Sequence, residues 1–153
     1  MNYRLVVTSD IHHAHYLRDI LPIVNSSDYF IFCGDGLGNV MAQSGSITVP
    51  MVCVRGNNDW TSRIDDVANI VIGETNALVT HGHRYGVRQG LDVLLSVAKQ
   101  KCCSLVLFGH THIYCDTVKD GIHFINPGAL CDGSYAIVEG DGKSFKCRRL
   151  QAN

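Results

Sequence analysis

The stretch YRLVVTSDIH at residues 3–12 runs from an apolar segment into a short polar cluster, and four later stretches repeat the pattern. They are YFIFCGD at 29–35, MVCVRGNND at 51–59, ALVTHGH at 77–83 and SLVLFGHTH at 104–112. Each polar cluster stands where a buried strand would end. In open α/β sheets the ligand crevice lies outside the carboxyl ends of the strands. We therefore expect the Asp, Asn and His side chains of all five clusters to meet at one edge.

Helical and hairpin patterns fill in the rest of the chain. The segments 14–24 and 87–100 each place their apolar side chains on one helical face. Pro22 is expected to kink or end the first of these helices. In the tail, alternating residues with turn signals at 119–121 and 139–142 predict antiparallel strands. The sequence thus predicts an α/β fold in which two sheets pack together with helices outside.

The composition is that of a compact globular chain. Its 153 residues are 46% hydrophobic and 18% charged, which is usual for a single domain, here residues 1–153. The formal net charge is −1 and no run of Lys or Arg occurs. The basic surface expected of a protein that binds duplex nucleic acid or an acidic membrane is therefore missing. Any affinity for phosphate must come from a local site.

The cysteines and the N-terminus predict a cytoplasmic protein. Seven cysteines occur, an odd number without a Cys-x-x-Cys pair, so we expect neither a disulfide framework nor a zinc ribbon. Cys33 and Cys53 lie inside apolar runs, where a reduced thiol acts as a small buried hydrophobe. The chain reaches Asp10 too early to include a signal sequence, and no run approaches the roughly 18 apolar residues of a membrane span.

The first three polar clusters offer oxygen and nitrogen ligands for metals. Asp10 and His12 are two residues apart at a strand end, so both side chains can face one cation. Asp35 has two carboxylate oxygens and could bridge two cations about 3.5 to 4 Å apart, although a Gly-Asp-Gly turn needs no metal. Asn57 could coordinate through its carbonyl oxygen, or it could simply occupy a turn.

Histidines supply the remaining candidate ligands. His110 and His112 follow an apolar run and are bracketed by Gly and Thr, with a solvated strand end as the competing interpretation. His81 ends another apolar run. His83 beside it could face a substrate or stand behind the ligands, or it could be an exposed loop residue. Together the clusters predict a two-metal ligand set, although each cluster alone has a structural alternative.

In their order along the chain, the clusters resemble the motifs of the calcineurin-like metallophosphoesterase superfamily. The matching motifs are Asp10-x-His12, Gly34-Asp35, Gly56-Asn57-Asn58-Asp59, His81-Gly82-His83 and Gly109-His110-Thr111-His112. THGHRYG, INPGA and SYAIVE are similar to its small single-domain bacterial and archaeal phosphodiesterase branch, and the likeness extends from Leu5 to about Glu139.

This resemblance implies both a fold and a ligand set. The fold is a four-layer αββα sandwich, with two packed mixed β-sheets flanked by helices. The first metal would be held by Asp10, His12, Asp35 and His112. The second metal would be held by Asp35, Asn57, His81 and His110, which are also the implied catalytic residues.

One position departs from many members of the superfamily. In those members a His that acts as general acid follows the ligand Asn, whereas this chain has Asn58, which has no proton with a useful pKa to donate. The small branch commonly lacks this His too. The departure favours leaving groups that need little protonation, or a donor such as His13, His83 or water. Asp59 is expected to orient a ligand by accepting hydrogen bonds.

The implied reaction is hydrolysis of a P–O bond. Two divalent cations, two Asp carboxylates and a bridging hydroxide leave a net charge of about +1, which attracts a phosphate ester anion. Coordination lowers the pKa of water toward ~7, so a metal-bridging hydroxide can attack phosphorus in line. The cations also stabilise charge in the transition state. We expect a phosphodiesterase acting on small phosphodiesters, with phosphomonoesters as further substrates.

The metals, the partners and a competing function complete the predictions. Manganese is the metal expected from the resemblance, and mixed N/O ligation is also compatible with Fe, Zn, Ni or Co. Exposed strand edges would allow a homodimer, whereas membrane and duplex nucleic-acid binding are not expected. The competing function is a non-catalytic metal-binding scaffold that binds a protein partner, as the same fold does in a eukaryotic retromer subunit. Against it, all seven ligand positions carry competent residue types.

Overall fold

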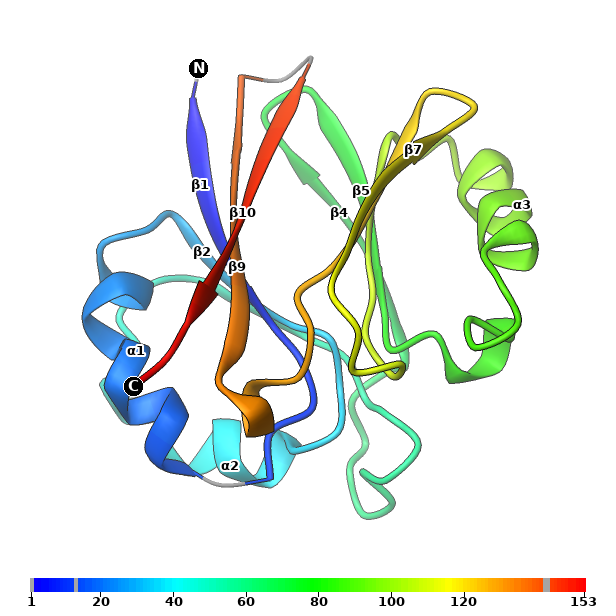
Figure 1. Cartoon of the computed structure of the whole chain (residues 1–153). Coiled ribbons are helices and arrows are strands. Elements are labelled where there is room, and N and C mark those ends of the chain that lie inside the picture. The colour runs from blue at the N-terminus through cyan, green and yellow to red at the C-terminus, as the bar shows by residue number, and fades with distance from the viewer. Residues whose placement is uncertain (1, 13, 142–143) are drawn as a thin grey trace.

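The computed structural model of the chain describes residues 2–12, 14–141 and 144–153 and contains two mixed five-stranded sheets (Figure 1). The first sheet has the order β10-β9-β1-β2-β3, formed by β1 (Tyr3–Thr8), β2 (Tyr29–Phe32), β3 (Met51–Cys53), β9 (Ser134–Gly140) and β10 (Phe145–Gln151). The second has the order β4-β5-β6-β8-β7, formed by β4 (Val67–Ile72), β5 (Thr75–Thr80), β6 (Leu105–Leu107), β7 (Cys115–Lys119) and β8 (Ile122–Asn126). Three neighbouring strands in each sheet are parallel, namely β1, β2 and β3 in the first and β5, β6 and β8 in the second.

Helices cover the outer faces of the two sheets. The helices are α1 (Ala14–Asn25), α2 (Leu37–Ala42) and α3 (Asp92–Gln100), with short 3-10 turns η1 (Ser44–Ser46), η2 (His83–Tyr85) and η3 (Leu130–Asp132). Apolar side chains of α1 and α2 pack with those of the first sheet, and those of α3 pack with the second sheet. Figure 1 shows α1 and α3 on opposite sides of the molecule. The four-layer αββα sandwich predicted from the sequence is therefore confirmed.

Successive side chains of the buried strands point to opposite faces of each sheet, and this alternation produces three separate apolar layers. Leu5 and Val7 of β1 face the space between the sheets, whereas Val6 faces the helices α1 and α2. In the same way, Leu105 of β6 lies between the sheets and Val106 packs toward α3. Because side chains alternate between faces, a slip of one residue would turn each strand inside out. The double burial fixes the register, and with it the position where each strand ends.

The helices differ from the sequence prediction at two points. The helix expected over 87–100 begins only at Asp92, because Gly90 has a φ of +134°, a conformation that favours glycine and does not fit a helix. The first helix does not end at Pro22, which was one of the two outcomes expected there, but continues to Asn25.

The parallel strands bring the polar clusters to one end of the molecule. The cluster after β1 hydrogen-bonds the cluster after β2, since the Asp10 N–H donates to the Gly34 carbonyl at 2.9 Å and the Ile11 N–H to the Asp35 carbonyl at 2.8 Å. In the second sheet the Gly109 N–H donates to the His81 carbonyl at 3.1 Å. Backbone hydrogen bonds thus continue beyond the strands and hold the clusters side by side. Among the described residues, no helix is both long and apolar enough to cross a bilayer.

Candidate metal centre

Four of the predicted ligands have an unusual backbone conformation. Asp10, Asp35, His110 and His112 have φ angles of +57°, +65°, +73° and +64°, in the left-handed region that residues other than glycine seldom adopt. Such conformations cost of order 1–3 kcal/mol each and persist where the surrounding structure imposes them, often at functional sites. Four of the six non-glycine residues with positive φ in the described part of the chain are therefore candidate ligands.

Two glycines allow the clusters to approach one another closely. A Cβ on Gly56 would lie 2.1 Å from Asp35 Oδ1, and a Cβ on Gly109 would lie 1.9 Å from Ser9 Oγ. Both contacts are far too short for a real side chain. A side chain at either position would push the β1 or β2 cluster away from its neighbour, so glycine is needed at both.

A buried group of two carboxylates and one imidazole forms the centre of the site. Asp10, Asp35 and His81 each offer a ligand atom, and these atoms all lie within 4.8 Å of one another. His81 Nε2 is 3.3 Å from Asp35 Oδ2 and 3.9 Å from Asp10 Oδ1. His81 Nδ1 lies 2.7 Å from the Cys33 carbonyl oxygen. A carbonyl can only accept, so Nδ1 carries a hydrogen; Nε2 faces the carboxylates, to which it donates when the ring is protonated and offers its lone pair when the ring is neutral.

One oxygen of Asp10 lacks a hydrogen bond although the side chain is fully buried. Asp10 Oδ2 accepts hydrogen bonds from Ser9 Oγ at 2.7 Å and from the His110 N–H at 3.2 Å. Asp10 Oδ1 accepts none from any described residue, and His112 Nε2 lies 3.2 Å from it. A buried carboxylate oxygen that accepts no hydrogen bond is costly, and a cation would satisfy it. The donor set therefore fits a divalent cation.

The outer histidines surround this centre. His110 Nδ1 lies 3.2 Å from His81 Nε2. The His12 ring lies 6.2 Å from the His112 ring, and the His83 ring lies 5.5 Å from the His81 ring, measured between ring centroids. His13, which the sequence analysis considered as a proton donor, lies outside the described residues.

Burial and neighbouring charges shift the pKa values of these groups in the metal-free protein. Burial would raise the pKa of Asp35, but hydrogen bonds from His81 and Asn58 outweigh it and lower the pKa to about 2. Burial would lower the pKa of His81, but the hydrogen bond to Asp35 and the charge of Asp10 raise it. Burial and the charge of nearby His81 lower the pKa of His83 and of His110. For the candidate ligand His110, the lowered pKa favours the neutral imidazole that metal ligation requires.

The Gly56–Asp59 loop fixes the position of Asp35. The Asn58 N–H donates to Asp35 Oδ1 at 2.8 Å, and the Asn58 side-chain amide donates to Asp35 Oδ2 at 2.9 Å. The Asp59 carboxylate accepts four backbone N–H groups, those of Asp35, Gly36, Leu37 and Gly56, at 2.8 to 3.1 Å. Asn57 is exposed in the same loop, and its backbone carbonyl accepts the Trp60 indole N–H at 2.7 Å.

Two further potential ligands lie beside His112 and were missed in the sequence. Cys131, Asp132 and His112 each offer a ligand atom, and these atoms lie within 4.8 Å of one another. Cys131 belongs to no pair or motif, so its spacing carries no metal-binding signal. Its position after the INPGA segment was the only cue, because that segment matches the family pattern.

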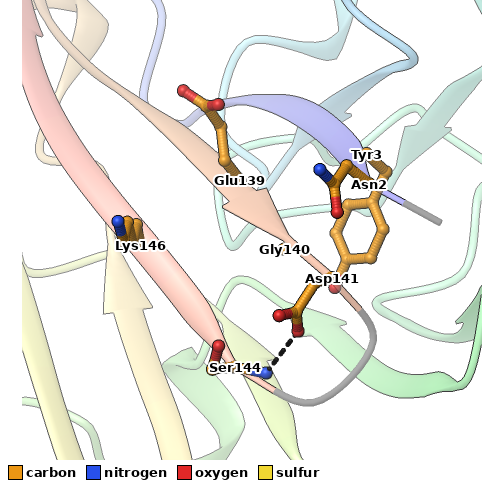
Figure 2. A pocket seen from close by; sticks show the side chains of 7 residues that line it. All are labelled: Asn2, Tyr3, Glu139, Gly140, Asp141, Ser144 and Lys146. Carbon is orange, nitrogen blue, oxygen red and sulfur yellow. Dashed lines mark hydrogen bonds between the residues drawn. The ribbon is translucent and has the colours of Figure 1, made fainter.

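Hollows flank the centre, and the surface around it is open. One of about 290 Å³ is lined by Asn58, Asp59 and the 84% exposed Trp60, among others, and another of about 340 Å³ by Arg88, Thr111, His112 and Ile113. A third hollow of about 250 Å³, shown in Figure 2, is lined by residues such as Glu139 and Lys146 and lies at the opposite end of β1. The first two hollows adjoin the candidate ligands, whereas the third does not.

Comparison with known families decides the relationship of this chain to other proteins. Residues 3–143 match the family model of the calcineurin-like phosphoesterase superfamily domain. The chain belongs to this superfamily. The resemblance found in the sequence is thereby confirmed, and the family implies divalent metal ions at the centre described above.

Relatives in the superfamily include bacterial, archaeal and eukaryotic proteins. A probable metallophosphoesterase of Bacillus subtilis, YsnB, is 32% identical over 103 residues, which are 67% of this chain and 59% of the relative. A phosphodiesterase of Methanocaldococcus jannaschii is 27% identical over 146 residues, covering 84% of each chain. The vacuolar protein sorting-associated protein 29 of Schizosaccharomyces pombe is 28% identical over 113 residues, covering 70% of this chain and 60% of the relative.

A solved structure from Streptococcus pneumoniae shares the fold. It is described as a predicted phosphoesterase and superposes with a TM-score of 0.81 over 99% of this chain and 90% of its own, at 23% sequence identity. At this identity the likeness concerns the fold alone.

Proposed function

We propose that this calcineurin-like phosphoesterase is a phosphodiesterase that uses two divalent metal ions to hydrolyse a P–O bond of small phosphodiesters. The observation that carries the proposal is the buried Asp10 Oδ1, which accepts no hydrogen bond from the described residues and lies next to ligand atoms of Asp35 and His81. Family membership and the archaeal relative named as a phosphodiesterase support it.

The proposed ligands divide between two cations that share Asp35. The first cation would be held by Asp10, His12, Asp35 and His112, and the second by Asp35, Asn57, His81 and His110. The short distances from Asp10 to His112 and from Asp35 to His81 support this division. Manganese remains the metal expected from the resemblance, and Fe, Zn, Ni and Co can bind the same oxygen and nitrogen donors.

The residues of the chain would prepare the site for a phosphate ester. Bound divalent cations supply Lewis-acid chemistry, by lowering the pKa of coordinated water and neutralising charge on phosphoryl oxygens. Asp35 stays ionised at neutral pH because its pKa is about 2. Asn58 donates to both Asp35 oxygens and so fixes the orientation of the carboxylate that would hold the cations. Arg88, which lines the hollow beside His112, is placed to hydrogen-bond a phosphate oxygen.

The leaving group would depart with little help from a protein acid. The Asn58 amide already donates to Asp35, and an amide has no useful proton to transfer. His83 lies near the centre, but burial and the charge of His81 lower its pKa, so it carries little proton at pH 7. We therefore propose substrates whose leaving oxygen needs little protonation. A monoanionic diester also suits the low net positive charge of the centre better than a dianionic monoester does.

Hydrolysis of a bis-aryl phosphodiester and of the matching aryl monoester tests the proposal. Each would be measured on metal-stripped protein, then with added Mn²⁺, and in an Asn57→Ala variant. Asn69→Ala, on β4 and outside the ligand set, serves as the control. We expect manganese-dependent turnover that favours the diester, survives in the control and falls in Asn57→Ala by at least the roughly 10- to 100-fold typical of losing a residue that supports a metal site.

A non-catalytic scaffold is the second candidate, supported by the similarity to the S. pombe sorting protein. It predicts tight metal binding without turnover of either ester. That result would favour a protein-binding function over phosphoester hydrolysis. The edge strands β3, β4, β7 and β10 would offer surfaces for a partner or a second copy.

A further inference from the structure

A second group of ligand atoms adjoins the centre on its exposed side. His112, Cys131 and Asp132 each present a nitrogen, sulfur or oxygen atom, and the three atoms lie within 4.8 Å of one another. His112 belongs to the ligand set described above, whereas Cys131 and Asp132 belong to none of the superfamily motifs found in this sequence. The Cys131 side chain is partly buried, and Asp132 is exposed.

Backbone hydrogen bonds hold Cys131 against the loop that carries Asp10. The Leu130 N–H donates to the Ser9 carbonyl at 2.8 Å, and the Cys131 N–H donates to the Asp10 carbonyl at 3.0 Å. The Asp132 N–H closes the turn by donating to the Ala129 carbonyl at 3.0 Å. The turn η3 is therefore fixed to the β1 cluster, and the thiol stands beside His112 because of the fold.

The unsatisfied oxygen of Asp10 points to a cation at this place. Asp10 Oδ1 is buried, accepts no hydrogen bond from the described part of the chain, and lies 3.2 Å from His112 Nε2. The same imidazole that lies beside this oxygen also has a nitrogen within 4.8 Å of the Cys131 thiol and of an Asp132 carboxylate oxygen. Thiolate, imidazole and carboxylate are all ligands of zinc in proteins, and thiolates favour zinc over manganese.

We propose that Cys131 is a thiolate ligand of the cation held by His112, with Asp132 beside it, and that this position selects a thiolate-binding cation such as zinc. The inference rests on the proposed metal centre and deepens it, because it makes the two positions chemically different. The set Asp35, Asn57, His81 and His110 offers only oxygen and nitrogen and suits manganese. The position at His112 adds sulfur and suits zinc. The centre would then hold two different metals.

Cobalt binding to the full-length metal-stripped protein tests the thiolate directly. Co²⁺ bound by a thiolate shows a near-ultraviolet charge-transfer absorption that oxygen and nitrogen ligands do not produce. We expect this band in the wild-type protein and in Cys102→Ser, which removes an exposed cysteine that is not part of the ligand set. We expect it to vanish in Cys131→Ser, whose Zn²⁺ affinity should fall by at least the roughly 10- to 100-fold that loss of a supporting residue costs.

A second measurement uses the unmodified chain and so does not depend on the folding of a variant. Alkylation of Cys131 by iodoacetamide would be followed by peptide mass spectrometry with and without Zn²⁺, with Cys102 as the internal reference. Selective slowing at Cys131 supports the inference. Equal rates at Cys131 with and without bound Zn²⁺ overturn it.

The outcomes separate this inference from the proposed function. Manganese-dependent diester turnover together with Co²⁺ binding that lacks the thiolate band overturns only the role of Cys131. A band that persists in Cys131→Ser does the same. Absence of both metal binding and turnover overturns the inference and the proposed function together.

Discussion

The Asp59→Asn substitution should destabilise the protein although it changes only one atom of the side chain. Asp59 Oδ2 accepts the N–H groups of Asp35 and Gly56, and Oδ1 accepts those of Gly36 and Leu37. An asparagine keeps one oxygen and replaces the other with an NH₂ group. Two backbone donors then face a donor instead of an acceptor, whichever way the amide is oriented.

The size of the effect follows from the number of hydrogen bonds lost. A hydrogen bond to a charged group contributes about 1.5–3 kcal/mol, so two of them set an upper range of about 3–6 kcal/mol. Asp59 is partly exposed, and water can reach some of the freed donors, so we expect the lower end, about 3 kcal/mol. For a domain of this length that corresponds to a fall in Tm of about 6–12 °C.

Urea denaturation of the metal-free protein measures this change, with Asp120→Asn as the control. Asp120 loses the same charge, but its carboxylate makes an exposed ion pair with Lys99 at 2.6 Å, and such pairs contribute little. A free energy of unfolding for Asp59→Asn within about 0.5 kcal/mol of the wild type would refute the claim that Asp59 holds the backbone at Asp35–Leu37 against the Gly56–Asp59 loop.

Three further predictions follow from the same geometry. Gly109→Ala should lower the free energy of unfolding, measured by urea denaturation, by about 1–3 kcal/mol, because its Cβ would lie 1.9 Å from Ser9 Oγ. A Cβ at Gly38 would meet nothing within 4 Å, so Gly38→Ala should be tolerated. The pKa of Asp35 is about 2 in the folded protein against 3.8 ordinarily. In the metal-free protein, ionised Asp35 should therefore contribute about 2 kcal/mol to the free energy of unfolding above pH ~4, and this contribution should be lost as the pH falls through ~2. Asp35→Asn should lack this pH dependence. Free Mn²⁺ at 100 times its Kd should stabilise the protein by about 2.7 kcal/mol, and chelation should reverse the rise in Tm; an unchanged Tm would contradict metal binding.

The meeting of the polar clusters could be predicted from the sequence because it depends only on the direction and order of the strands. Parallel strands end at the same edge, so apolar runs followed by Asp10, Asp35, His81 and His110 were sufficient to bring these residues together. The two-sheet architecture followed from the same runs and from the alternating tail. Family resemblance then supplied the division of ligands between two metals.

Features that depend on backbone geometry or on distant contacts could not be predicted. The left-handed conformations at Asp10 and His112 could not be predicted from residue type, since Asp and His adopt them more often than most residues but still seldom. Gly90 was visible in the sequence, but its φ of +134° and the late start of α3 were not. Cys131 lies beside His112 because the chain between β8 and β9 returns to the end of β1. No local sequence pattern predicts this contact.

The departure at Asn58 shows how the structure adds to a sequence comparison. From the sequence, Asn58 was the residue that replaces a general acid. In the structure it donates twice to Asp35, from its backbone N–H and from its side-chain amide. The position thus serves to orient a candidate bridging ligand, which explains how an asparagine can be useful there.

X-ray diffraction from crystals grown with Mn²⁺ and Zn²⁺, recorded at the absorption edge of each metal, tests the central claim most directly. We predict two anomalous peaks about 3.5–4 Å apart with one oxygen of Asp35 bound to each or one oxygen shared between them. A single peak, or two peaks of which neither contacts Asp35, would contradict a two-metal centre and with it the proposed phosphodiesterase.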